Sequence, residues 1–96
     1  MKVFLSEDAD SDLLNVHAYL AERNPAAVVS LAHEFEAKFQ NLSRFPFIGR
    51  DRSNLVRGIR SVVAGNYVIF YRVDPDRVTI MRVLDGRSDI DAEFQR

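Results

Sequence analysis

Four arginines in the C-terminal half are the residues of this sequence best suited to recognition chemistry. Arg60, Arg72 and Arg82 fall inside apolar runs that are typical of β-strands, and Arg87 follows Gly86 just after the last run. An arginine stays charged at neutral pH, and its planar fork binds a carboxylate or a phosphate through two parallel hydrogen bonds. Two interpretations are open. The four arginines lie in or beside a sheet face that receives an acidic ligand or phosphates, or they form the solvated face of the sheet.

Residue types that perform catalysis are scarce. The sequence has no cysteine, which excludes a disulfide scaffold and a thiolate nucleophile or metal ligand. His33-Glu34 begins like the HExxH motif of zinc proteases, but Ala37 occupies the second histidine position, and His17 is expected on a different helix. None of the seven serines lies in a GxSxG context. We therefore expect no catalytic residues, no metal and no cofactor.

The net charge of −1 conceals an asymmetry between the two halves of the chain. Residues 1–43 contain three basic and seven acidic residues, whereas residues 44–96 contain ten arginines and seven acidic residues. The segment 44–72 contains six of these arginines and a single acid, Asp51. A basic C-terminal half predicts an acidic partner, which is either a protein or a nucleic acid.

Length and composition limit the possible architectures. The 96 residues suffice for one hydrophobic core, and a hydrophobic content of 47% is enough for a globular fold. No apolar stretch approaches the roughly 20 residues that a membrane span requires. The opening sequence MKVFLSEDAD turns acidic too early for a signal peptide. We therefore expect a single cytoplasmic domain over residues 1–96, with no membrane association.

The N-terminal half predicts one short strand and two helices. The run KVFLS (residues 2–6) is β-prone, and Ser6 can cap a helix whose acidic first turns favour the positive end of the helix dipole. Asn24 and Pro25 end this helix and start another, in which apolar residues recur every three or four positions as far as Leu42. The pair predicts a helical hairpin with a short loop.

The C-terminal half predicts three strands: IRSVVA (59–64), YVIFYRV (67–73) and RVTIMRVL (77–84). Gly65-Asn66 is a two-residue hairpin signal, and Asp74-Pro75-Asp76 marks the next turn, so both connections favour antiparallel pairing. The order β-α-α-β-β-β predicts an α+β fold in which the helical hairpin packs on a small antiparallel sheet.

Two irregular segments complete the predicted fold. The stretch SRFPFIGRDRSNLVRG (43–58) has the composition of a loop, and we expect Phe45, Phe47 and Ile48 to anchor it. The tail GRSDIDAEFQR (86–96) is polar, and we expect it to form a last helical turn.

Three stretches of the chain, taken in order, resemble the RelE/ParE superfamily of bacterial toxins from type II toxin–antitoxin modules, and its ParE branch in particular. LSEDADSDL (5–13) is similar to the opening Leu-Ser-x-x-Ala-x-x-Asp-Leu of that family. The other two stretches are FPFIGR (45–50) with LVRGIRSV (55–62), and YVIFYRV (67–73) with IMRVLDGRSD (80–89). The resemblance covers nearly the whole chain and implies the RelE/ParE toxin fold.

Two activities from different classes occur in that superfamily. RelE-like members are ribosome-dependent endonucleases that cut messenger RNA, whereas ParE-like members block DNA gyrase by binding it. A nuclease must move protons and stabilise the developing charge of a phosphate. Arg60 and Arg87 match two basic positions of the nuclease members, but Asp85 stands where many relatives carry histidine, and the tail has Phe94 and no tyrosine or histidine. We therefore expect a non-enzymatic gyrase inhibitor, with an mRNA endonuclease as the alternative.

The resemblance also implies partners for the chain. A cognate ParD-like antitoxin with an acidic, amphipathic C-terminal segment would neutralise the toxin in a hetero-oligomeric complex, and we expect no sequence-specific DNA binding by the toxin alone. The residues expected to contact the antitoxin or the target are those of the sheet and two exposed residues of the hairpin: Arg60, Arg72, Arg82, Arg87, Leu14 and Tyr19.

Overall fold

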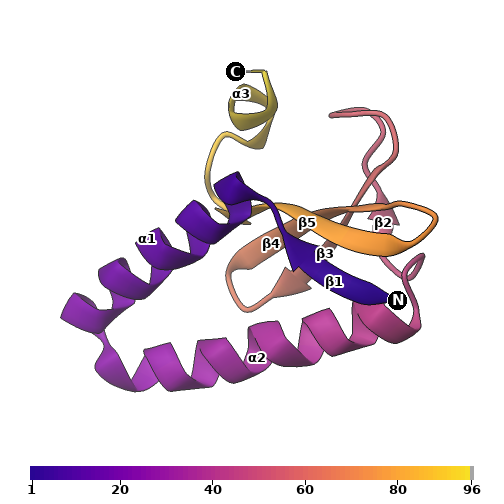
Figure 1. The fold of residues 1–96 in the computed structure, drawn as a ribbon. Coiled ribbons are helices and arrows are strands. Elements are labelled where there is room, and N and C mark those ends of the chain that lie inside the picture. Colours follow the sequence, from indigo (N-terminus) through magenta and orange to yellow (C-terminus); the bar gives the residue numbers. More distant parts are fainter. Residues whose placement is uncertain (96) are drawn as a thin grey trace.

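The computed structural model describes residues 1–95 as a five-stranded sheet with two long helices on one face (Figure 1). The elements are β1 (Lys2–Leu5), α1 (Glu7–Arg23), α2 (Pro25–Arg44), β2 (Arg50–Asp51), β3 (Ile59–Ala64), β4 (Tyr67–Val73), β5 (Arg77–Asp85) and α3 (Ile90–Phe94). The predicted order of elements is confirmed, and so is the last helical turn, α3. The two-residue strand β2 is an addition, which the loop composition of its surroundings did not indicate.

The sheet has the strand order β1-β5-β4-β3-β2, and its pairs are antiparallel with one exception. The exception is β1, which runs parallel to β5 with Lys2 opposite Arg77 and Leu5 opposite Ile80. The expectation of a wholly antiparallel sheet was therefore wrong for β1. Turn signals specify pairing between neighbouring strands only, whereas a parallel pair needs a long connection, which the helical hairpin and the β2–β4 strands supply here.

The two predicted turns are confirmed. Ala64 pairs with Tyr67, which leaves Gly65 and Asn66 as a two-residue hairpin loop. Gly65 has a φ of +58°, whereas Asn66, like every non-glycine residue of the described chain, has a negative φ. A positive φ at the first turn residue alone is the pattern of a type II′ turn. In the next turn the Asp74 N–H donates to the Arg77 carbonyl at 2.8 Å, which closes the connection from β4 to β5.

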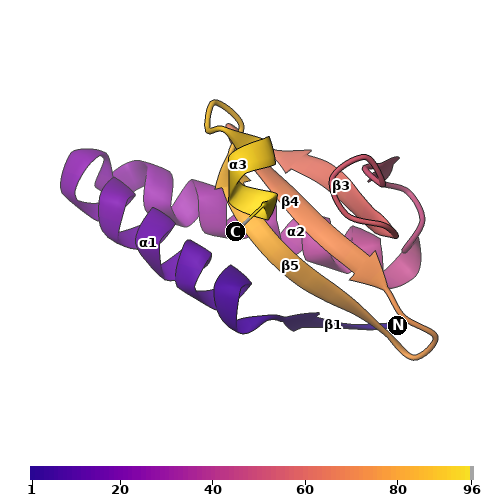
Figure 2. The ribbon, with the colours of Figure 1, turned by 90° about the horizontal axis from the view of Figure 1, so that it is seen from above.

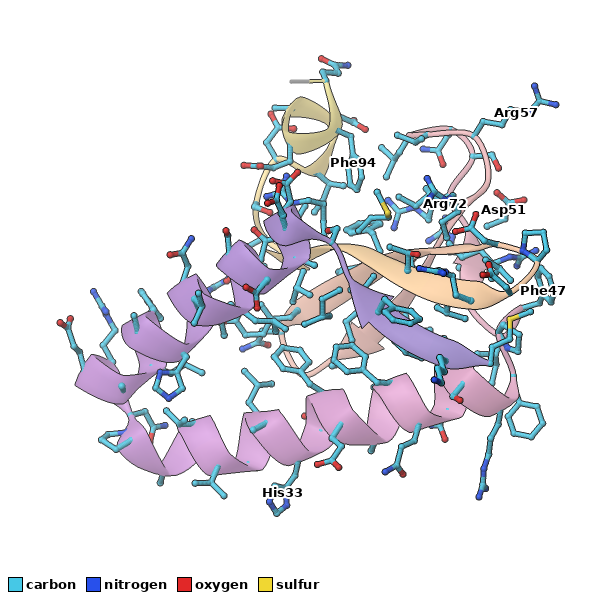
Figure 3. All side chains as sticks on the ribbon, in the orientation of Figure 1. His33, Phe47, Asp51, Arg57, Arg72 and Phe94 are labelled. Carbon is cyan, nitrogen blue, oxygen red and sulfur yellow. The ribbon has the colours of Figure 1, made fainter. Side chains whose placement is uncertain are left out.

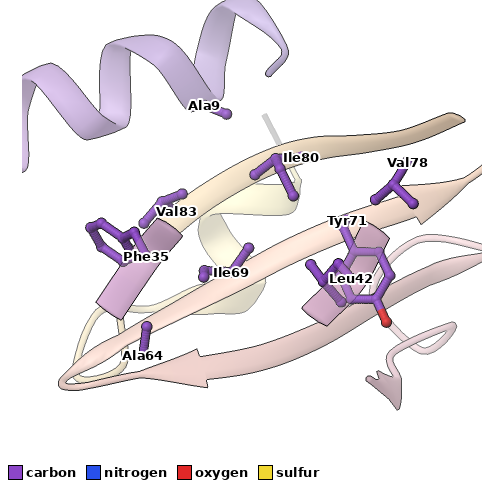
Figure 4. Close-up of a cluster of buried hydrophobic side chains, with 9 residues drawn as sticks. All are labelled: Ala9, Phe35, Leu42, Ala64, Ile69, Tyr71, Val78, Ile80 and Val83. Atoms are coloured by element: carbon purple, nitrogen blue, oxygen red, sulfur yellow. The ribbon is translucent and has the colours of Figure 1, made fainter. Parts of the chain in front are cut away.

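The main core lies between the sheet and the two long helices (Figure 4). On β4 the side chains of Ile69 and Tyr71 face α2, and on α1 the fully buried Ala9 lies in the same cluster. The remaining members of the cluster are Phe35, Leu42, Ala64, Val78, Ile80 and Val83. The apolar stripe predicted for the second helix therefore buries two of its members, Phe35 and Leu42, under the sheet.

A smaller apolar cluster covers the opposite face of the sheet, where α3 lies over β4 and β5 (Figure 2). Phe70 of β4 is fully buried, and its ring meets the ring of Phe94 edge-on at 4.8 Å. Apolar cover on both faces explains why β4 is apolar in both alternations. Met81 is an extra residue in β5, because Phe70 pairs with Arg82 and Tyr71 with Ile80. This β-bulge turns Arg82 toward the face that carries α3.

Candidate binding surfaces

Arg82 is enclosed in an ion-pair network that joins three elements. Its Nε and Nη2 atoms donate to the two carboxylate oxygens of Asp12 on α1 at 2.8 and 3.0 Å, and Nη2 lies 3.3 Å from Glu93 on α3. Asp12 also accepts the backbone N–H of Val83 at 2.9 Å. The side chains of Arg82 and Asp12 are only 19% and 13% exposed, and the hydrogen bond with Asp12 raises the pKa of Arg82. Arg82 thus holds α1 and α3 on the sheet, and the expected open face does not exist around it.

Arg72 and Arg87 form local pairs at the surface. Arg72 lies 3.1 Å from Asp74, and Arg87 lies 2.9 Å from Asp85. Hydrogen bonds from the side chain and the backbone of Arg87 lower the pKa of Asp85 to about 2. The side chain of Arg87 is nevertheless 82% exposed, so its guanidinium is accessible to a partner that offers a better carboxylate.

Arg60 lies on the helix side of the sheet, away from the other three arginines. It pairs with Tyr71, whose ring is in the main core, and its Nη1 atom donates to the carbonyls of Gly49 and Phe47 at 2.9 and 3.3 Å. In the sheet register Arg60 is level with Tyr71, and Asp85 with Tyr67. This difference of four residues corresponds to about 13 Å along a strand. The four arginines therefore do not converge on one site.

An apolar groove of about 310 Å³ opens between the two long helices, which diverge from their connecting turn (Figure 1). The groove is lined by Leu13, Val16, His17, Leu20, Val28, Leu31, Ala32, Phe35, Glu36 and Phe39. Two predicted contact residues, Leu14 and Tyr19, are 65% and 51% exposed, as expected for the hairpin surface. Neither residue lines the groove. Tyr19 instead lines a smaller pocket that also contains Asp85, and the guanidinium of Arg23 lies over its ring.

Residues 44–60, called the arginine loop below, form a second surface that sequence reasoning did not single out. Phe45, Phe47 and Ile48 are more than 60% exposed, so the expectation that they anchor the loop was wrong. The anchor is the buried Gly49, whose N–H donates to the Tyr71 hydroxyl at 2.8 Å. A Cβ at this position would lie 2.4 Å from that hydroxyl, so only glycine fits. Three large apolar residues within four positions, in a loop with a single acid, were the signal that could have identified this surface.

The described part of the chain contains neither a cluster of metal-ligating side chains nor a helix fit to span a membrane. Within residues 1–95, His, Asp and Glu side chains nowhere gather in a group of three or more that could hold a metal ion. No helix over the same residues combines the length and the apolar character that crossing a bilayer requires.

Comparison with known sequences identifies the family. A family model described as "ParE toxin of type II toxin-antitoxin system, parDE" matches residues 3–90. The chain is 34% identical to Toxin ParE3 of Caulobacter vibrioides over 94 residues, which cover 97% of this chain and 94% of that toxin. It is also 35% identical to Toxin ParE1 of the same organism over 81 residues, which cover 83% of each protein.

Two solved structures share the fold. One is described as a chromosomal ParDE toxin–antitoxin system from P. aeruginosa. The match has a TM-score of 0.75 at 17% sequence identity, and it covers 88% of this chain and 95% of the matched chain. The other is the toxin–antitoxin complex RelBE2 from Mycobacterium tuberculosis, with a TM-score of 0.58 at 32% identity and the same two coverages. The mixed sheet and the helical hairpin are thus shared with both, and the chain belongs to the ParE family of toxins from type II toxin–antitoxin systems.

Proposed function

We propose that this ParE-family chain is a cytoplasmic toxin that inhibits DNA gyrase by binding it, without chemistry of its own, and that a cognate ParD-like antitoxin neutralises it. Gyrase as the target is implied by the resemblance to the ParE branch. The alternative within the superfamily is ribosome-dependent cleavage of messenger RNA, and it requires convergent catalytic groups.

The separation of Arg60 from Arg87 is the observation that favours binding over RNA cleavage. Arg60 is held by two backbone carbonyls at one end of β3, and Arg87 is held by Asp85 beyond the far end of β5. The backbone positions are offset by about 13 Å along the sheet, and each guanidinium is already held by different groups of this chain, so the two are not directed at a common phosphate. Asp85, beside Arg87, would also repel a phosphate.

The pocket beside Asp85 also lacks a good proton donor for the leaving group of RNA cleavage. Tyr67 lines the pocket that contains Asp85. Burial, and then the charge of Asp85, raise the pKa of the Tyr67 hydroxyl above its ordinary value. A raised pKa keeps the phenol protonated and makes it a weaker general acid, which supports the non-enzymatic reading.

The groove between the long helices suits the antitoxin. An amphipathic helix binds by placing its apolar face in a hydrophobic groove, and the apolar side chains of Leu20, Val28 and Leu31 line this one. An extended continuation of the segment beyond the groove and along the sheet would bring its acidic residues to exposed arginines, of which Arg87 and Arg72 are 82% and 50% exposed. Arg82 is too enclosed to take part without breaking its internal pairs.

The function is tested with purified chain in two assays. We expect it to inhibit DNA supercoiling by purified gyrase and to trap cleaved DNA, and we expect messenger RNA to stay intact in a translating extract. Addition of the cognate antitoxin should restore supercoiling. Cleavage of messenger RNA without any effect on gyrase would sink the proposal and establish the endonuclease alternative.

The antitoxin site is tested with two adjacent valines of α2. Val28 lines the groove, whereas Val29 is 61% exposed and does not line it. Val28→Asp places a charge in the groove, and we expect at least a tenfold loss of antitoxin affinity in isothermal titration calorimetry. Val29→Asp is the matched control and should bind normally. Equal losses from both substitutions would contradict the groove assignment.

A further inference from the structure

The arginines of the arginine loop differ from all other described arginines in forming no ion pair, although Asp51 lies opposite Arg60 in the pairing of β2 with β3. Arg23, Arg72, Arg77, Arg82 and Arg87 each form an ion pair with a carboxylate. Within residues 1–95, none of the five loop arginines forms such a pair; they are Arg44, Arg50, Arg52, Arg57 and Arg60. Concentrated positive charge that is not neutralised internally favours an anionic partner.

Three of these arginines are fully available to a ligand. Arg52 and Arg60 use their guanidinium groups within the fold, through Ser61 and the carbonyls of Phe47 and Gly49. The side chains of Arg44, Arg50 and Arg57 are exposed and make no hydrogen bond or ion pair with residues 1–95. The single acid of the loop, Asp51, accepts the backbone N–H of Ser53 at 2.8 Å.

Exposed apolar side chains lie among these charges. The segment Phe45-Pro46-Phe47-Ile48 is flanked by Arg44 and Arg50, and with Arg44 it lines a shallow open hollow. Figure 3 shows Phe47 and Arg57 at the end of the molecule opposite the hairpin turn, with Arg57 extending away from the body. Exposed apolar side chains and arginines without ion pairs thus occur together in the arginine loop.

The loop is held in place before any partner arrives. Gly49 is fixed by the Tyr71 hydroxyl, and Arg60 clamps the two carbonyls that flank Ile48, while its guanidinium lies 5.2 Å from the Phe47 ring. A pre-ordered loop loses little conformational entropy on binding, which favours a functional surface.

We infer that the arginine loop binds single-stranded DNA without sequence preference. Proteins that bind single strands stack bases on aromatic side chains and hold the phosphates with basic residues, and proteins that unstack a duplex insert Phe, Ile or Pro beside arginines. The arginine loop contains both components within residues 44–57. An acidic peptide would need a deep groove or a long free strand edge, and β2 is only two residues long. This binding lies beyond gyrase inhibition and does not require it.

Fluorescence anisotropy with the purified full chain and a labelled DNA strand of about 20 nucleotides tests the inference. Three phosphate contacts predict that affinity falls about 20-fold between about 50 and 200 mM salt. The triple variant Arg44→Ala/Arg50→Ala/Arg57→Ala should lose at least tenfold in affinity and most of the salt dependence. Phe47→Ala should weaken binding by roughly tenfold and leave the salt dependence unchanged, because it removes stacking and no charge.

A charge-matched control separates the loop from overall charge. Arg23→Ala/Lys38→Ala/Arg77→Ala removes an equal number of positive charges from other elements. This variant should bind DNA like the unmodified chain. Circular dichroism checks that every variant is folded. Equal losses from the two triple variants would overturn the inference. So would binding of the unmodified chain to polyglutamate or to phosphatidylglycerol vesicles, but not to DNA, that is lost in the loop triple variant. The assay contains no gyrase, so its failure is distinct from failure of the proposed function.

Discussion

The arginines between positions 44 and 87 divide into two groups with opposite environments. Those at positions 72–87 are neutralised by carboxylates of the same chain, whereas those of the arginine loop contact backbone carbonyls, aromatic rings or solvent. The first group interrupts apolar strands and therefore attracts attention in the sequence, but its charges are largely satisfied internally. The second group forms no ion pair within residues 1–95, and three of its members, Arg44, Arg50 and Arg57, make no hydrogen bond there either. A charged residue within an apolar strand is thus a weak indicator of unpaired charge at the surface.

The largest difference between the groups should appear on removal of Asp12. Asp12→Ala leaves the enclosed Arg82 with Glu93 as its remaining partner. It also removes the acceptor of the Val83 N–H. Breaking one side of a buried pair costs about 3 kcal/mol or more of unfolding free energy, measured by urea denaturation. Asp76→Ala, which breaks the exposed pair with Arg77, is the control and should not change the urea midpoint. A midpoint for Asp12→Ala equal to that of the control would contradict the structural role of Arg82.

The next largest effect concerns the anchor of the arginine loop. Gly49→Ala would place a Cβ 2.4 Å from the Tyr71 hydroxyl and 2.8 Å from the Ser61 carbonyl, so both the core and the loop must shift. Overpacking of this kind destabilises by about 1–3 kcal/mol. Tyr71→Phe keeps the ring and removes only the acceptor of the Gly49 N–H, which should cost about 1 kcal/mol. Wild-type stability of Gly49→Ala would show that the loop is not held by this contact.

A smaller effect, on binding and not on stability, is expected for the exposed arginines of the arginine loop. Arg50→Ala and Arg57→Ala should leave the urea midpoint unchanged, because neither side chain makes a hydrogen bond or ion pair within residues 1–95. Their effect should be confined to DNA affinity in the anisotropy assay. A clear loss of stability in either variant would show that these side chains serve the fold.

The smallest expected effect is a change in one titration. Because Arg87 lowers the pKa of Asp85 to about 2 from an ordinary 3.8, the stability that this pair contributes is present above about pH 4 and is lost as the pH falls toward 2. Carboxyl-detected NMR should show the low midpoint of Asp85 in the unmodified chain and a return toward the ordinary value in Arg87→Ala. An unchanged midpoint would mean that Arg87 does not hold this carboxylate in solution.

Local chemistry explains which features could be predicted from the sequence. Gly65-Asn66 and the Asp-Pro-Asp turn encode the β3–β4 and β4–β5 pairings, and the three- and four-residue spacing up to Leu42 encodes α2. The pairs of Arg72 with Asp74 and of Arg87 with Asp85 join residues two positions apart, so they too are visible in the sequence.

The features that were missed depend on contacts distant in sequence. Asp12 and Arg82 are 70 residues apart, and the β1–β5 pairing joins residues 75 apart, so no local signal indicates either one. The exposure of Phe47 and Ile48 depends on the insertion of Gly49 against Tyr71, a contact over 22 residues. Apolar residues in a loop are ordinarily expected to be buried, and only the tertiary anchor shows that these are not.

The measurement that tests the central claim most directly is a titration of purified gyrase with this chain, read as the amount of cleaved DNA that becomes trapped. Inhibition by binding predicts that trapping rises with dose, reaches a plateau once the chain is in slight excess over gyrase, and does not grow with time at lower doses. The opposite result would be no trapping at any dose, together with messenger RNA cleavage in a translating extract that continues with time at catalytic amounts of the chain.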